Sequence, residues 1–204
     1  MHAKTILILG GTRQALDLAA ALNKNHKVIT SLAGRTKSPK KPAGKLRVGG
    51  FGGVKALAAY LVTENIDILV DATHPFAATI SKNAAAAAAM ANVPCVMLQR
   101  PPWQAGAGDN WEEFPDLEAA AENLNSNTRC FLTIGRQELL AFKNRKDVWF
   151  LVRMIDAPAT PLSAAKLEAA RKLGLRVMMI QRPEVPAGEL VETVGAVERW
   201  LVNR

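Results

Sequence analysis

Two spacings of hydrophobic residues alternate along the chain. Short aliphatic runs, such as residues 5–11 and 66–72, have the length of strands and end in glycines or at an aspartate. Between such runs, apolar residues return at helical spacing, as Ala15, Leu18 and Leu22 do. Strands that alternate with helices predict a mainly parallel sheet with helices on both faces, and right-handed crossovers make the fold Rossmann-like.

The same pattern organises the whole α/β chain of 204 residues, which is long enough for one large domain or two small ones. Strands are expected at residues 5–11, 27–32, 46–51, 66–72, 94–99, 130–135, 148–155 and 176–181. Helices are expected at residues 13–25, 54–65, 76–92, 117–125, 136–144, 163–174 and near 190–201. Residues 100–116 break the pattern and are expected to form a surface loop. We therefore predict two Rossmann-like lobes, residues 1–125 and 126–204, with a site in the cleft between them.

The composition indicates a folded protein. Hydrophobic residues make up 49% of the chain and charged residues 22%, which excludes a disordered chain. No apolar stretch reaches 18 residues and the N-terminus lacks a small-residue cleavage site, so neither a membrane span nor a signal peptide is expected. Cys95 and Cys130 belong to no C-x-x-C pair, and buried free thiols in a cytoplasmic protein are the default interpretation.

The formal net charge of +8 favours a polyanionic partner. Such a partner is nucleic acid, anionic lipid, or a small molecule with many carboxylates or phosphates. The basic residues are scattered apart from the cluster Lys37–Lys41, and no zinc-finger, RRM or helix-turn-helix pattern is present. Nucleic-acid binding is therefore kept only as a minor alternative.

The first strand-to-helix turn is rich in glycine. Gly10, Gly11 and Thr12 lie there, where glycine lets the backbone approach a phosphate and the helix N-terminus offers N–H groups and partial positive charge. The pattern is G-G-T-x-x-A and lacks the complete G-x-G-x-x-G fingerprint of dinucleotide-binding proteins. A tight turn with Thr12 as a helix N-cap is the alternative.

The second strand ends without an acid. NAD-specific Rossmann proteins usually place a carboxylate there for the ribose 2′-hydroxyl. Here Ser31, Arg35 and Thr36 follow the strand instead, and an arginine with hydroxyls suits a 2′-phosphate. The missing acid and the presence of Arg35 together favour NADPH over NADH. The alternative is that Arg35 is only a solvated charge in a loop.

Two further turns carry related signals. "LRVGGFGG" places Gly49, Gly50, Gly52 and Gly53 around Phe51, either close to a ligand or in a simple flexible turn. "LTIGRQEL" ends another strand and begins a helix with an arginine, which suits a carboxylate or phosphate but also an ordinary helix N-terminus.

The quoted motifs together resemble the precorrin-6A reductase family of cobalamin biosynthesis. "GGTRQA", "SLAGRT", "VGGFGG", "DATHPFAATISKNA", "RPPW", "GDNW", "LTIGRQEL" and "LVRMID" follow one another in the family's order and spacing. The resemblance covers residues 4 to about 156 densely, and the tail in "KLEAARKLGLRVMMIQRP". "DATHPFA" and "IGRQEL" are its most distinctive parts.

The resemblance implies an NADPH-dependent oxidoreductase acting on CH–CH groups. It would deliver a hydride to a ring carbon of precorrin-6A and a proton to the neighbouring carbon, giving precorrin-6B. The polycarboxylated tetrapyrrole substrate suits the positive net charge, and contacts with neighbouring enzymes of the pathway are implied, without nucleic acid or membrane. Expected cofactor-binding residues are Gly10, Gly11, Thr12, Arg13, Ser31, Gly34, Arg35, Thr36, Thr73, His74, Pro75 and Phe76. Expected substrate-binding residues are Trp103, Gly135, Arg136, Gln137 and Arg153.

One departure from the family pattern follows Asp156. Relatives carry a longer stretch there, with a K-[ND]-S-G-G-like turn, before the helix at "KLEAARKLG". Here "APATPLS" leads almost directly to that helix, so several tens of residues are absent. We expect the second lobe to be shortened near the substrate.

The turn "DATHPFA" follows a strand at the carboxyl edge of the predicted sheet, where ligands bind. We expect Thr73 to Phe76 to form part of the nicotinamide wall, Pro75 to occupy the first helical turn, and Asp71 to hold the turn through backbone N–H groups. His2 and His26 lie too far away in the sequence for a metal set, so no metal is expected. A capped helix with a half-buried histidine is the alternative.

No residue is assigned as a catalytic acid, because hydride transfer needs no protein nucleophile and the proton can come from solvent. A short-chain dehydrogenase would show Tyr-x-x-x-Lys, but Tyr60 precedes Glu64. Another NADP-dependent reductase and a non-catalytic NADPH-binding regulatory module remain alternatives. The sequence leaves open whether the substrate is cobalt-free or cobalt-bound, and it does not give the oligomeric state.

Overall fold

The computed structural model of the chain describes residues 3–34, 40–152, 162–202 and 204. The chain forms two compact units. The first unit consists of residues Met1–Pro102 and Pro183–Arg204, and the second consists of Trp103–Arg182. None of the helices in the described part of the chain has the length and apolar character to cross a bilayer.

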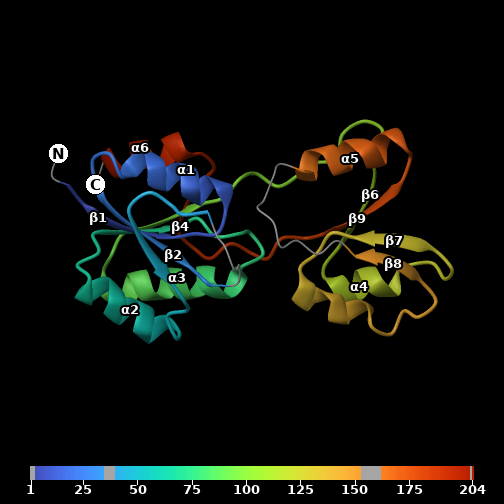
Figure 1. Cartoon of the computed structure of the whole chain (residues 1–204), viewed down its shortest axis with the longest axis horizontal. Helices are drawn as coiled ribbons and strands as arrows, with labels where there is room; N and C mark the ends of the chain where they lie inside the picture. The colour runs from blue at the N-terminus through green and yellow to red at the C-terminus, as the bar shows by residue number, and fades with distance from the viewer. Residues whose placement is uncertain (1–2, 35–39, 153–161, 203) are drawn as a thin grey trace. The chain divides into compact units, whose positions relative to one another are not determined.

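The first unit is built on a six-stranded parallel sheet (Figure 1). Its strands are β1 (Thr5–Leu9), β2 (Lys27–Leu32), β3 (Lys45–Val48), β4 (Ile68–Asp71), β5 (Cys95–Leu98) and β10 (Glu189–Val191). Their order across the sheet is β10-β5-β4-β1-β2-β3. The strand order therefore reverses between β1 and β4, which is the Rossmann arrangement and confirms the predicted mainly parallel α/β fold for this unit.

Helices cover both faces of this sheet, as Figure 1 shows. The helices of one face are α1 (Arg13–Leu22) and α6 (Val194–Val202), and those of the other are α2 (Val54–Thr63) and α3 (Ala78–Ala91). Successive residues of β1 feed opposite cores: Ile6 and Ile8 pack with α1 and α6, while Leu7 and Leu9 pack with α2 and α3. All four side chains are almost fully buried, which explains why the strand is a continuous apolar run.

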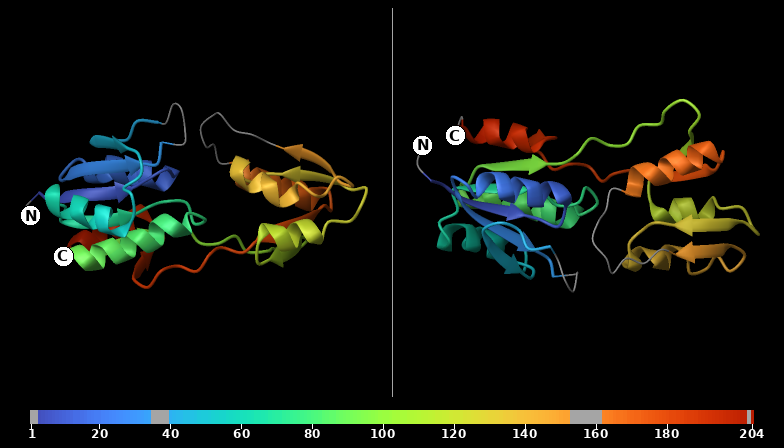
Figure 2. Two further views of the ribbon diagram at one scale, coloured as in Figure 1. Left: turned by 90° about the horizontal axis from the view of Figure 1, so that it is seen from below. Right: turned by 45° about the horizontal axis from the view of Figure 1, so that its top comes forward.

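The C-terminal segment returns to the first unit. Strand β10 pairs with β5, and α6 packs beside α1 (Figures 1 and 2). Val197 and Leu201 of α6 are buried in the same core as Leu18. The first unit thus ends at Pro102 and resumes at Pro183, which differs from the expected single boundary near residue 125. The reason is this apolar face of α6, which is buried against the first sheet.

The second unit holds two separate two-stranded parallel sheets (Figure 1). One pairs β6 (Asn110–Phe114) with β9 (Arg176–Ile180), and the other pairs β7 (Arg129–Leu132) with β8 (Trp149–Val152). Its helical elements are α4 (Leu117–Glu122), α5 (Leu162–Lys172) and the 3₁₀ helix η1 (Arg136–Phe142). A small core forms around Ala121, Leu132 and Phe142.

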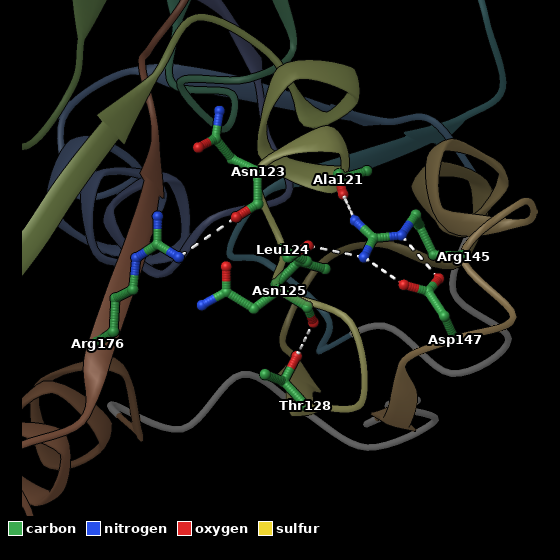
Figure 3. Close-up of polar contacts among 8 residues, drawn as sticks. All are labelled: Ala121, Asn123, Leu124, Asn125, Thr128, Arg145, Asp147 and Arg176. Atoms are coloured by element: carbon green, nitrogen blue, oxygen red, sulfur yellow. Dashed lines mark hydrogen bonds and ion pairs between the residues drawn. The ribbon is translucent and has the colours of Figure 1, made fainter.

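Arginine side chains join the elements of the second unit (Figure 3). Arg145 donates to the carbonyl oxygens of Ala121 and Leu124 at the end of α4, and its Nε and Nη2 bind the Asp147 carboxylate at 2.9 and 2.8 Å. Arg176 of β9 donates to the carbonyl oxygen of Asn123 at 3.3 Å. Arginine side chains thus cover carbonyl groups at and just beyond the C-terminal end of α4, where helices leave acceptors open.

Three sequence predictions are corrected here. Residues 110–114 form β6, although residues 100–116 were expected to be loop; pairing with β9 supplies the ladder that the sequence alone does not reveal. Residues 189–191 form an edge strand, so the last helix starts at Val194 and not near residue 190. The helix expected at 136–144 is a 3₁₀ helix that ends at Phe142.

Candidate functional site

The turn between β1 and α1 can be made only by glycines. The Gly10 N–H donates to the Ser31 carbonyl at 2.9 Å, and a Cβ on Gly10 would lie 2.9 Å from Thr30 Cγ2. Gly11 has a φ of +114°, and a Cβ there would point into open space, with no heavy atom of the described chain within 4 Å. The backbone is thus bare beside the start of α1, a ten-residue helix whose first N–H groups attract anions.

Thr12 connects two turns of the sheet. Its Oγ1 accepts the Ala15 N–H at 3.1 Å, which makes Thr12 the N-cap of α1. The same hydroxyl donates to the Ala72 carbonyl at 2.7 Å, directly after β4. Thr12 therefore joins the carboxyl ends of β1 and β4 where the strand order reverses, which is the place where open α/β sheets bind their ligands.

Asp71 organises the turn after β4. This residue is completely buried, and its Oδ1 accepts the N–H of Thr73 at 3.0 Å and the hydroxyl of Thr73 at 2.7 Å. The predicted role of Asp71 in holding the turn is thereby confirmed. Its Oδ2 is buried without a hydrogen-bond partner in the described chain. Burial, and secondly the charge of Asp71, raise the pKa of the nearby Cys95 thiol to about 12.

His74, Pro75 and Phe76 form an exposed edge beyond Thr73. The imidazole and phenyl rings stack with centroids 5.8 Å apart, and His74 Nδ1 accepts the Phe76 N–H at 3.3 Å. Helix α3 begins only at Ala78, because the Ala77 N–H closes a turn onto the His74 carbonyl at 2.7 Å. Pro75 therefore lies before the helix, and its expected place in the first helical turn is wrong.

The end of β2 lies beside the guanidinium of an arginine from β3. Ser31 is buried, and its Oγ accepts from Arg47 Nη1 at 3.1 Å. Gly34 follows in a left-handed conformation with a φ of +80°. Arg35 and Thr36, which were expected to bind the 2′-phosphate, lie outside the described residues.

The sequence prediction did not single out Arg47, because its contacts with Ser31 and Tyr60 join positions far apart in the chain. Arg13 was predicted to bind the cofactor, and its exposed side chain forms an ion pair with Asp17, one turn along α1, at 2.8 Å.

The residues expected to bind substrate belong to the second unit. Trp103 is partly exposed, and Gly135 precedes η1. The carboxylate of Glu138 accepts the Gly135 N–H, so this N-terminus already carries an acid from its own helix. Arg136 and Gln137 begin η1, but their side chains are not among the described ones, and Arg153 lies outside the described residues.

The described cofactor candidates of the first unit line the carboxyl edge of one sheet, after β1, β2 and β4. A bare glycine backbone at the start of α1 and a capped helix N-terminus fit the pyrophosphate of a dinucleotide. The strand order and the helices on both faces of the sheet define a Rossmann-like α/β protein.

Comparison with known proteins gives the family. Residues 5–165 match the family model "Precorrin-6x reductase CbiJ/CobK". The chain is 41% identical to the precorrin-6A reductase of Rhodococcus erythropolis, with 96% of each chain covered, and 37% identical to that of Rhodobacter capsulatus, with 97% of this chain and 96% of the relative covered. A solved structure described as CobK precorrin-6A reductase superposes with a TM-score of 0.90 at 36% identity, over 98% of this chain and 96% of that one. The chain belongs to the precorrin-6x reductase CbiJ/CobK family, as its motifs predicted.

Proposed function

We propose that the protein reduces the precorrin-6A macrocycle to precorrin-6B with NADPH, in cobalamin biosynthesis. The observation that carries this proposal is the similarity to precorrin-6A reductases over nearly the whole chain, combined with the glycine turn and Thr12 link at the switch point of the sheet. A hydride goes to one ring carbon and a proton to its neighbour. In keeping with its two unpaired thiols, we place the enzyme in the cytoplasm.

The first unit holds the cofactor, which supplies the hydride when bound. The Gly10-Gly11 backbone and the N-terminus of α1 receive the pyrophosphate, since the two glycines have no side chain and the first turn of α1 contains no acid. Thr73 to Phe76 form the wall beside the nicotinamide, and Thr12 fixes that wall relative to the pyrophosphate turn. Arg35 and Thr36 follow β2 in the sequence and remain candidates for the 2′-phosphate.

The second unit supplies the substrate contacts. Precorrin-6A carries many carboxylates, and guanidinium groups pair with carboxylates bidentately. Arg136 and Arg153 are therefore our candidates for the acidic side arms, with Gly135 and Gln137 beside Arg136. Trp103 offers an aromatic surface to the macrocycle. We assign no proton donor, and we expect His74 to position the reactants and not to be the essential acid.

The relatives are longer than this chain. The alignment with the Rhodococcus erythropolis protein extends over 239 positions, against 204 residues here. The relatives therefore contain positions with no counterpart in this chain, and the sequence places this difference after Asp156. The experiment must therefore measure whether this shorter chain itself catalyses the reduction.

The test is NADPH oxidation followed by absorbance under anaerobic conditions, with precorrin-6A or cobalt-precorrin-6A as the substrate. We expect oxidation to depend on a tetrapyrrole, and the preferred form identifies the natural substrate. In a matched sample, Gly11→Val places a side chain where the pyrophosphate lies, so cofactor binding should vanish while the far-ultraviolet spectrum is kept. Tight NADPH binding without oxidation by either tetrapyrrole would favour a regulatory module instead.

A further inference from the structure

Arg47 of β3 is held at the end of β2 by neutral oxygen atoms. Its Nη1 donates to Ser31 Oγ at 3.1 Å and to the Gly49 carbonyl, and its Nη2 donates to the Gly50 carbonyl at 2.9 Å. None of these three acceptors carries a charge. The bonds therefore fix the position of the guanidinium, and within the described residues no anion neutralises its positive charge.

Two aromatic rings fix the plane of the same guanidinium. Its central carbon lies 3.7 Å from the ring centroid of Phe51 and 5.2 Å from that of Tyr60. The rings themselves pack edge to face at 5.2 Å, and both are partly buried against the core of α2 and α3. A stacked, half-buried arginine loses little further freedom when it binds a ligand, which favours affinity.

Two other cations of the first unit are paired with acids. Lys45, on the same strand, forms an ion pair with Glu64 at 3.3 Å, and Arg13 forms one with Asp17. Within the described residues Arg47 has no such carboxylate partner. An arginine in an apolar and partly buried position without an acid beside it is suited to an anion from outside the chain.

Part of the guanidinium is left for a further acceptor. Arginine has five N–H groups, and the three bonds of Arg47 leave its Nε–H and one Nη2–H. Elsewhere in this molecule the same two nitrogens bind a carboxylate: Nε and Nη2 of Arg171 both lie 2.8 Å from the oxygens of Asp109. Arg47 therefore keeps two N–H groups, of the kinds that bind a carboxylate in Arg171, for the oxygens of a phosphate.

The end of β2 is where Rossmann proteins distinguish the ribose 2′-hydroxyl from a 2′-phosphate. We propose that Arg47 recognises the 2′-phosphate of the cofactor and so makes the enzyme specific for NADPH over NADH. This inference rests on the proposed function, because it requires that the first unit binds a nicotinamide dinucleotide. Ser31 and Phe51 are then positioning residues, which hold the guanidinium in place.

The experiment compares two probes that differ only by this phosphate, adenosine 2′,5′-bisphosphate and adenosine 5′-monophosphate. Calorimetric titration is made with the full-length protein, with Arg47→Gln, and with Lys45→Gln as a control that removes a cation from the same strand. We expect Arg47→Gln to weaken the bisphosphate by roughly 10- to 100-fold, the range for a hydrogen bond to a charged group. Binding of the monophosphate should change by less than about twofold.

Several results would overturn the inference. Equal losses for both probes would show that Arg47 only braces the Gly49-Gly50 turn, and an unchanged bisphosphate affinity would remove Arg47 from the site. A loss of similar size in Lys45→Gln would indicate general attraction by charge. If Arg47→Gln does not fold, Arg47→Lys is tested instead, because lysine keeps the charge but lacks the guanidinium. If Arg47→Lys bound the bisphosphate with the full wild-type preference, the inference would also be contradicted.

The proposed function is tested separately by the wild-type protein. If wild-type protein bound neither NADPH nor NADH, the proposed function would fail, and this inference with it. If wild-type protein preferred NADPH and Arg47→Gln kept that preference, only the role of Arg47 would be lost, and Arg35 would become the candidate for the phosphate.

Discussion

The two units of this molecule use parallel strands in opposite ways. In the first unit six strands form one sheet, both of whose faces are covered by helices, and Leu7 and Ile8 at its centre are fully buried. In the second unit four strands form two separate pairs. Phe131 and Leu151, which face each other across β7 and β8, are half exposed. Only the first unit satisfies the usual requirement that a parallel sheet be covered on both sides.

The two units differ in how many faces of their strands are covered. The inward residues of β7 and β8, such as Leu132 and Phe150, pack against α4 and η1, whereas the alternate residues Phe131 and Leu151 stay half exposed among the residues that the structure describes. We therefore expect the first unit to carry most of the stability, and the second to be the weaker partner.

The largest expected effect is a core truncation in the first unit. Leu7→Ala removes a fully buried side chain from a sheet covered on both faces and should cost about 2–5 kcal/mol. The matched change in the second unit, Leu132→Ala, removes a side chain that is 6% exposed from the smaller core and should cost less than Leu7→Ala. Urea unfolding followed by far-ultraviolet circular dichroism measures both. Similar losses would contradict the proposed concentration of stability.

The next largest effect concerns the order in which the two units unfold. Three of the four tryptophans, Trp103, Trp111 and Trp149, belong to the second unit, and Trp200 belongs to the first. Tryptophan emission therefore reports mainly on the second unit, whereas circular dichroism reports on both. We expect the emission change to precede the dichroism change as urea rises. Coincident transitions would show that the two units unfold as one.

The sequence predicted the first unit better than the second. Strands β1 and β4 were predictable because long aliphatic runs need burial on both faces, and the turn at Gly10 and Gly11 because only glycine fits there. Strand β6 was not, because its sequence "NWEEF" is mostly polar and its ladder depends on β9, more than sixty residues away.

The candidate site shows the same limit. Thr12 could be recognised as a helix cap from its position, but its second bond, to Ala72, depends on the order of strands in the sheet. Arg47 stands in a short strand without any distinctive spacing. Its importance comes from Ser31 and Tyr60, which the fold brings to it from two other elements.

Each unit also contains one of the two cysteines, which gives a chemical probe of both. Burial raises the pKa of Cys95 to about 12 with a contribution from Asp71, and burial raises the pKa of Cys130 as well. The thiolate is the reactive form, and Cys95 belongs to the better-covered sheet. In native-state labelling with a disulfide reagent we therefore expect Cys130 to react faster than Cys95. The variants Cys95→Ala and Cys130→Ala show which labelling phase belongs to which cysteine. Faster labelling of Cys95 would contradict the expectation that the first unit is the more stable one.

The smallest expected effect is in the pH dependence. In the second unit, hydrogen bonds from Arg171 and Arg145 lower the pKa of Asp109 and Asp147, respectively. A carboxyl whose pKa is lower in the folded state stabilises the fold above the unfolded value of about 3.9, and this contribution is lost as the pH falls below it. The raised pKa of Cys95 acts in the opposite range: its contribution to the first unit is complete below the unfolded thiol value of about 8.5 and is lost as the pH rises towards 12.

Acid should therefore weaken the second unit and alkali the first. The two effects can be separated by following tryptophan emission and circular dichroism during urea unfolding at pH 3–4 and at pH 9–10. We expect Asp109→Asn to flatten the acid dependence only slightly, because ion pairs that water can reach contribute little to stability. Cys95→Ala should flatten the alkaline dependence and leave the acid side unchanged. An acid dependence confined to the dichroism signal, with the emission midpoint constant, would show that Asp109 and Asp147 do not control the stability of the second unit.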